Sequence, residues 1–302
     1  TLFPYTTLFR SLLRWQLRSA PDAARAAELH VELAKLLQEH FLAVGEAVQH
    51  YEQALELCPG HVEATTTLID VYVSAGASER AGVVIDAELR RGDPRPTAVR
   101  AAELHRRLAK IEAETHANVP AAARHLQAAL ELLPDDIAAL RAFGVLYLGS
   151  GKAGDGVRKA ADIFYKAAEL ARRGQRHDEA IKLLRRALSL APDHQEAAAA
   201  LESTLVDAQD WLALDDLYRE WLLYDQGPDA VPLVLRRADL LETRLHRREE
   251  ARQLYEEASR HEPPDGESWR RLEQIYEATG DVHALASLLE ARAERMPGEI
   301  PS

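Results

Sequence analysis

The chain contains twelve histidines, the side chain best suited to binding a transition metal or carrying a proton at neutral pH. None belongs to an HExxH motif, and no two lie three or four residues apart, the spacing that a metal site on one helix requires. His30 and His105 are 75 residues apart, as are His50 and His125, and an internal repeat explains this recurrence better than metal binding does. We therefore predict no metal site.

Other patterns that mark catalysis are incomplete. The stretch GSGKAGDG resembles a phosphate-binding loop, but Leu146 stands where that loop needs glycine and Ala153 where it needs serine or threonine. There is no GxSxG motif, and Cys58 has no evident neighbour that would stabilise a thiolate. Adjacent acidic residues such as Asp215 and Asp216 are common on helix surfaces. The sequence predicts no catalytic residues, no cofactor and no enzymatic activity.

The composition indicates which elements carry these residues. Alanine is abundant, whereas aromatic residues make up only 6% of the 302, so the chain favours helices over strands. A single cysteine excludes a disulfide framework, and no apolar run is long enough to span a membrane. The net charge of −12 argues against nucleic acid as a partner. We expect an all-α protein.

The sequence repeats itself. AELHVELAKL at 27–36 aligns with AELHRRLAKI at 102–111, and YEQALELCP at 51–59 aligns with LQAALELLP at 126–134. Apolar residues in these segments recur with a period of 3.6 residues, which is typical of amphipathic helices. Each repeat has room for two helices of about four turns.

The repeats resemble the tetratricopeptide repeat, a 34-residue helix pair with small and large apolar residues at fixed positions. Alanine at two positions of the second helix lets the paired helices approach closely, and a proline ends that helix. The residues that carry the resemblance are Trp269, Leu272, Tyr276, Gly280, Leu285, Leu289 and Pro297, then Leu235, Ala238, Ala251, Tyr255, Ala258 and Pro263, then Phe164, Ala168, Ala180, Leu184, Ala187 and Pro192, then Leu68, Tyr72, Gly76, Ala81 and Ile85, then Ala47, Tyr51, Ala54 and Pro59, and finally Ala122, Leu126, Ala129 and Pro134.

The resemblance implies a right-handed α-solenoid of about seven to eight stacked antiparallel helix pairs over residues 12–302. The concave surface of such a solenoid is lined by the first helix of each pair. Basic side chains recur at the expected concave positions, where guanidinium groups would suit carboxylates of a partner. The candidate partner-binding groove comprises Arg106, Arg107, Lys110, Arg236, Arg237, Arg244, Arg270 and Arg271. Alternatively, these cations pair with glutamates of the chain itself on a solvated face.

Two regions depart from the repeat. Residues 1–11, TLFPYTTLFRS, equal the translation of a common sequencing adapter, so we expect them to be an assembly artefact, with the natural N-terminus missing. Residues 12–21 then resemble the end of a second helix. The pattern is also irregular at about 149–160, because the next repeat starts ten residues too early. We predict an unpaired helix there, with a local change of direction.

The leading hypothesis is a non-catalytic interaction scaffold that binds a partner peptide or helix, for example an acidic one, in the concave groove. The alternative is a regulatory or sensory arm of a larger enzyme or signalling protein whose catalytic domain lies upstream. Self-association through an uncapped C-terminal end is a third hypothesis. The excess of arginine over lysine suggests a bacterial source, and the compartment stays unknown, with the cytoplasm as the default expectation.

Overall fold

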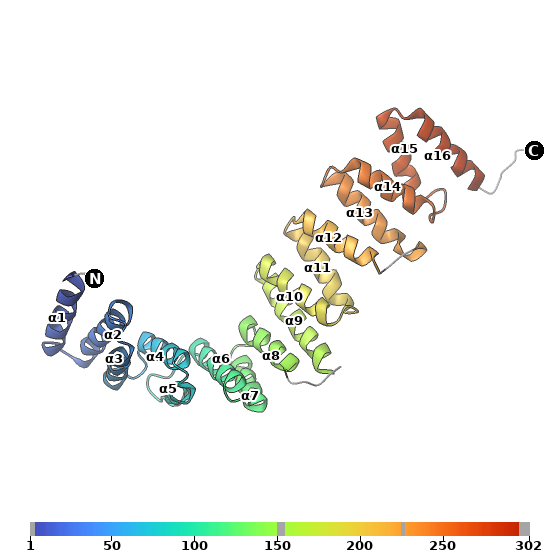
Figure 1. The fold of residues 1–302 in the computed structure, drawn as a ribbon. Coiled ribbons are helices and arrows are strands. Elements are labelled where there is room, and N and C mark those ends of the chain that lie inside the picture. Colours follow the sequence, from blue (N-terminus) through green and yellow to red (C-terminus); the bar gives the residue numbers. More distant parts are fainter. Residues whose placement is uncertain (1–3, 150–154, 225–226, 296–302) are drawn as a thin grey trace, which may run out of the picture. The chain divides into compact units, whose positions relative to one another are not determined.

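The computed structural model describes residues 4–149, 155–224 and 227–295. These residues form sixteen α-helices and one short 3₁₀ turn, Pro228–Ala230, and contain no strand. Most consecutive helices pack against each other, and they alternate in direction (Figure 1). The predicted all-α solenoid of stacked helix pairs is confirmed.

The chain divides into two units, and the first comprises residues 1–170 and 189–192. A single helix precedes three helix pairs here, and two further helices follow them. The helices are α1 (Pro4–Arg18), α2 (Ala23–His40), α3 (Val44–Leu57), α4 (Val62–Ser74), α5 (Ser78–Arg90), α6 (Ala98–Glu114), α7 (Val119–Leu132), α8 (Ile137–Gly149) and α9 (Asp155–Arg173), whose last turn passes into the second unit.

The second unit comprises residues 171–188 and 193–302. Its first helix is α10 (His177–Leu190). The six helices that follow form three pairs: α11 (Gln195–Asp207) with α12 (Trp211–Leu222), α13 (Val231–Thr243) with α14 (Arg248–Ser259), and α15 (Glu267–Thr279) with α16 (Val282–Arg295). None of the helices in the described residues combines the length and the apolar character that crossing a bilayer demands.

Two helices, α8 and α9, flank the region where the repeat spacing is irregular. The chain passes from α8 to α9, which is the first helix of the next pair, so α8 lacks a second helix. Phe164 of α9 lies against Gly144 of α8, where an added Cβ would come within 3.0 Å of the ring. The glycine-rich linker at 150–154 lies outside the described residues.

Small residues allow the helices of each pair to pack closely. Ala47, Ala54, Ala122 and Ala129 of α3 and α7 are completely buried, in agreement with the repeat pattern. The corresponding alanines of α10 and α14 are at most 1% exposed. Since alanine loses no side-chain entropy on burial, it keeps the helix axes close at low cost.

The turn between the two helices of every pair contains one residue with left-handed backbone geometry. Gly76 and Gly280 have φ angles of 74° and 71°, which glycine adopts without strain. The other five turns place a non-glycine residue in the same conformation, with φ between 50° and 55° at Leu42, Ala117, Gln175, Gln209 and His246.

Candidate interaction surface

The basic residues predicted to line a groove lie mainly on the first helices of the pairs. In the second unit, α13 contributes Arg236 and Arg237, and α15 contributes Arg270 and Arg271. Arg244 directly follows α13. In the first unit, α6 carries Arg106, Arg107 and Lys110.

Two arginines of the second unit link successive first helices. Arg236 of α13 donates to both carboxylate oxygens of Glu202 on α11, at 2.8 and 3.0 Å. Arg271 of α15 donates to Asp239 on α13 at 3.2 Å. We call these two ion pairs the first-helix ladder. The side chain of Arg236 remains 52% exposed and that of Arg271 33%, so both guanidinium groups are held in place while solvent still reaches them.

Arg237 has a different environment from its neighbour Arg236. Its Nε donates to Asp215 of α12 at 2.8 Å, and Arg219 donates to the other oxygen of the same carboxylate at 2.7 Å. Asp215 is 1% exposed, so it does not lie on the helix surface as its sequence suggested. Burial alone would raise the pKa of Asp215, but the hydrogen bonds from Arg237 and Arg219 outweigh it and lower the pKa.

The two remaining candidate groove residues of the second unit, Arg244 and Arg270, also have partners within it. The guanidinium of Arg244 lies 4.9 Å from the ring centroid of Trp211, a cation–π contact. Arg270 donates to the main-chain carbonyl of Asp265 at 3.2 Å. That bond leaves the side chain on the surface of α15, next to Arg271.

The first unit shows a similar arrangement. Arg107 of α6 lies 2.5 Å from Asp70 of α4 and 3.2 Å from Glu103 of its own helix. Arg106 forms an ion pair of 2.9 Å with Asp136, just before α8. The charged groups of Lys110 and Glu114 are as far as 4.0 Å apart, and both side chains are well exposed. This ion pair therefore contributes little to stability.

The sequence alone identified the cations but not their carboxylate partners. Asp70, Glu202 and Asp239 lie 32 to 37 residues before the arginines they contact, about one repeat earlier. An acidic residue one repeat upstream of an arginine is a detectable signal, because equivalent first helices stack next to one another. A partner carboxylate would therefore meet guanidinium groups that already have one acidic neighbour.

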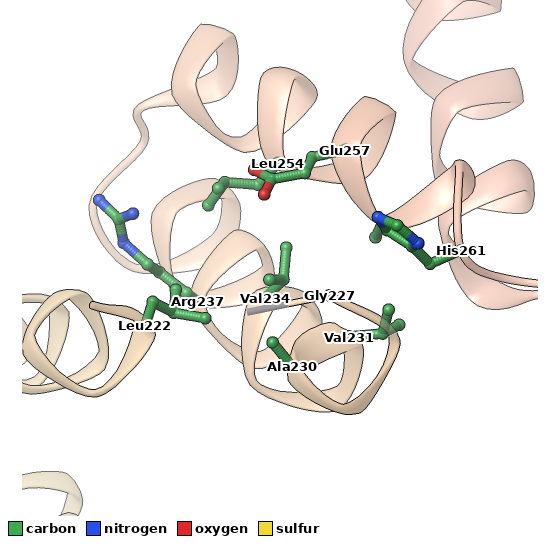
Figure 2. A pocket seen from close by; sticks show the side chains of 10 residues that line it. Leu222, Gly227, Ala230, Val231, Val234, Arg237, Leu254, Glu257 and His261 are labelled. Atoms are coloured by element: carbon green, nitrogen blue, oxygen red, sulfur yellow. The ribbon is translucent and has the colours of Figure 1, made fainter. Parts of the chain in front are cut away.

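A hollow of about 420 Å³ lies within the second unit, between α12, α13 and α14. Figure 2 shows its apolar wall of Val231, Val234 and Leu254, with Arg237 and His261 at opposite ends. Arg237, Glu257 and His261 also line it, so the hollow offers polar as well as apolar surface. It is large enough to accept a side chain of a partner.

Comparisons with known proteins agree with the helical repeat. A model of the tetratricopeptide repeat family matches residues 161–194, which correspond to α9 and α10 with the turn that follows. No curated protein matches the chain.

Among solved structures, the chain is similar to YrrB, described as a TPR protein with an unusual peptide-binding site, at 24% identity over 58% of this chain and 91% of that one, with a TM-score of 0.35. It is similar to MamA of Desulfovibrio magneticus RS-1 at 19% identity over 57% and 98%, with a TM-score of 0.38. A human IFIT1 dimer with m7Gppp-AAAA matches at 14% identity over 97% and 68%, with a TM-score of 0.34.

Proposed function

We propose that this chain, a tetratricopeptide-repeat protein, is a non-catalytic interaction scaffold that binds an acidic peptide segment along the first helices of its second unit. Repeats of this family generally act as interaction modules, so we expect the binding site on an exposed surface rather than in an enclosed pocket.

The first-helix ladder is the observation that carries the proposal. Arg236 and Arg271 lie on successive first helices, and Glu202 and Asp239 hold them in place. Pre-ordered guanidinium groups lose less side-chain entropy when a partner binds. Each is exposed enough to donate a second, charge-assisted hydrogen bond to a peptide carboxylate.

Arg270 extends the same surface on α15. Arg237 has a structural role instead, because its guanidinium donates a hydrogen bond to the buried carboxylate of Asp215. A test of binding should therefore change the two ladder residues Arg236 and Arg271 and leave Arg237 intact. Reversing the charge of Arg237 would disturb the packing of α12 on α13. A loss of binding could then not be distinguished from a folding defect.

The experiment measures fluorescence anisotropy with a labelled glutamate-rich peptide and its glutamine counterpart. Wild type should bind the acidic peptide in preference to the neutral one, and added salt should weaken binding. Replacing Arg236 and Arg271 by glutamate should reduce affinity at least tenfold, because each charge-assisted hydrogen bond contributes about 1.5–3 kcal/mol.

The matched control replaces Arg248 and Arg260 by glutamate. Both are exposed and belong to α14 or follow it directly, so the net charge changes equally on a second helix. This control should bind like wild type. Equal loss in the two double variants, or no preference of wild type for the acidic peptide, would refute the proposed groove.

A further inference from the structure

Two histidine pairs lie in the first unit, each between the two helices of one repeat. The Nδ1 atoms of His30 on α2 and His50 on α3 are 2.9 Å apart. Those of His105 on α6 and His125 on α7 are 3.2 Å apart. The ring centroids are separated by 5.1 and 5.5 Å, so the Nδ1 edges of both rings face each other.

The two pairs are equivalent by sequence as well as by geometry. Each joins residues 20 positions apart, and the second pair follows the first by 75 residues. The repeat therefore accounts for where the histidines recur, as the sequence indicated. It does not account for the contact itself, because either partner could have pointed into solvent.

The two nitrogens of each pair are close enough together for one metal ion to bind both, once the rings turn so that both lone pairs point at the ion rather than at each other. Imidazole nitrogen binds Zn²⁺ at about 2.0–2.1 Å, so two nitrogens 2.9 to 3.2 Å apart would subtend about 90–100° at the ion. That range falls between the square-planar angle suited to Cu²⁺ or Ni²⁺ and the tetrahedral angle suited to Zn²⁺. A hydrogen bond between one protonated and one bare Nδ1 gives the same contact without metal.

We propose that each histidine pair is a binding site for a divalent transition-metal ion of the zinc, nickel or copper class, which would fasten the first helix of the repeat to the second. The described residues contain no group of three or more histidine, cysteine, aspartate or glutamate side chains able to hold a metal. Each pair thus supplies two protein ligands, and water completes the coordination. Binding of this kind is exchangeable.

The surroundings keep the nitrogens available as ligands. Burial is the largest cause that lowers the pKa of all four histidines, so they are uncharged at neutral pH. Arg14 and Glu46 act on His50 with opposite signs. Around the second pair, Asp86 and Glu112 oppose Arg124, which leaves an excess of negative charge. We expect the His105–His125 site to bind a cation more tightly than the His30–His50 site.

The test is calorimetric titration of the full chain with Zn²⁺ at neutral pH. Wild type should bind two ions per chain. Replacing His30 by glutamine should remove one ion, and replacing His105 by glutamine should remove the tighter one. The variant with both substitutions should retain neither, with unchanged helicity by circular dichroism.

The matched controls are His40→Gln and His283→Gln, at exposed histidines that belong to neither pair. They should bind two ions like wild type. Electron paramagnetic resonance of wild type with Cu²⁺ gives a readout that needs no variant, since each bound ion should couple to two imidazole nitrogens. The proposal is wrong if wild type binds no Zn²⁺ in the micromolar range, if the doubly substituted chain still binds two ions, or if only one nitrogen couples.

Discussion

At the scale of single residues, the turn inside each helix pair imposes one strict demand on the backbone. Seven turns require a left-handed residue, yet only two of them have glycine. The repeat pattern identified Gly76 and Gly280 from sequence. It could not identify Ala117 as their equivalent, because alanine gives no local signal for left-handed geometry and only the repeat register reveals the position.

At these left-handed turn positions, replacing alanine by glycine and replacing glycine by alanine should change stability in opposite directions. Ala117→Gly should stabilise the chain by about 0.5–1 kcal/mol, because relief of left-handed strain exceeds the added entropy of the unfolded chain. Gly280→Ala should destabilise it by a similar amount, although a Cβ there meets no atom within 4 Å. Urea unfolding measures both. Destabilisation by Ala117→Gly would contradict the strain argument, since Ala117 is exposed and loses no packing.

At the scale of elements, an ion pair with a buried carboxylate links α12 to α13. Asp215 on α12 accepts from Arg237 on α13 and from Arg219 on its own helix. A buried carboxylate must keep its partners, because an unpaired charge in the interior is costly. Arg237 consequently helps to position α13, the helix that carries Arg236 of the first-helix ladder.

Removing Arg237 alone should destabilise the chain more than removing both Arg237 and Asp215. Arg237→Met leaves Asp215 buried with Arg219, and with Arg247 at 3.9 Å, so we expect a loss of about 2–3 kcal/mol in unfolding free energy. Combining Arg237→Met with Asp215→Leu should cost less than Arg237→Met alone, because no charge then stays buried. A double-mutant cycle in urea measures the coupling. Simple additivity of the two changes would show that the pair contributes nothing specific.

At the scale of the whole molecule, the sequence predicted the class of fold more completely than the contacts on its surface. Alanine positions such as Ala47 and Ala122, and the unpaired α8, follow from a repeat that each segment carries locally. The contact between His30 and His50 depends on the rotation of two helices about their axes, which a linear pattern leaves open. For the same reason the pairing of Arg236 with Glu202 could not be read from either residue alone.

Within the described residues, α16 has exposed apolar side chains along one side. No residue of α16 is fully buried; Val282 and Leu289 form an exposed stripe, whereas Leu285 and Leu288 pack against the core of the last repeats. Ala286 and Ala293 complete this stripe at helical spacing. A stacked array buries such faces between neighbours, so we expect a second copy of the chain to cover this one.

Leu289→Glu should then abolish concentration-dependent association while leaving the melting temperature within a few degrees of wild type, because the side chain is already 43% exposed. Leu212→Glu on α12 places the same charge at an even more exposed leucine and should leave association unchanged. Light scattering coupled to gel filtration over a dilution series separates the two variants. A wild-type chain that stays monomeric at every concentration would show that the stripe on α16 tolerates water without a partner, as isolated apolar residues on protein surfaces often do.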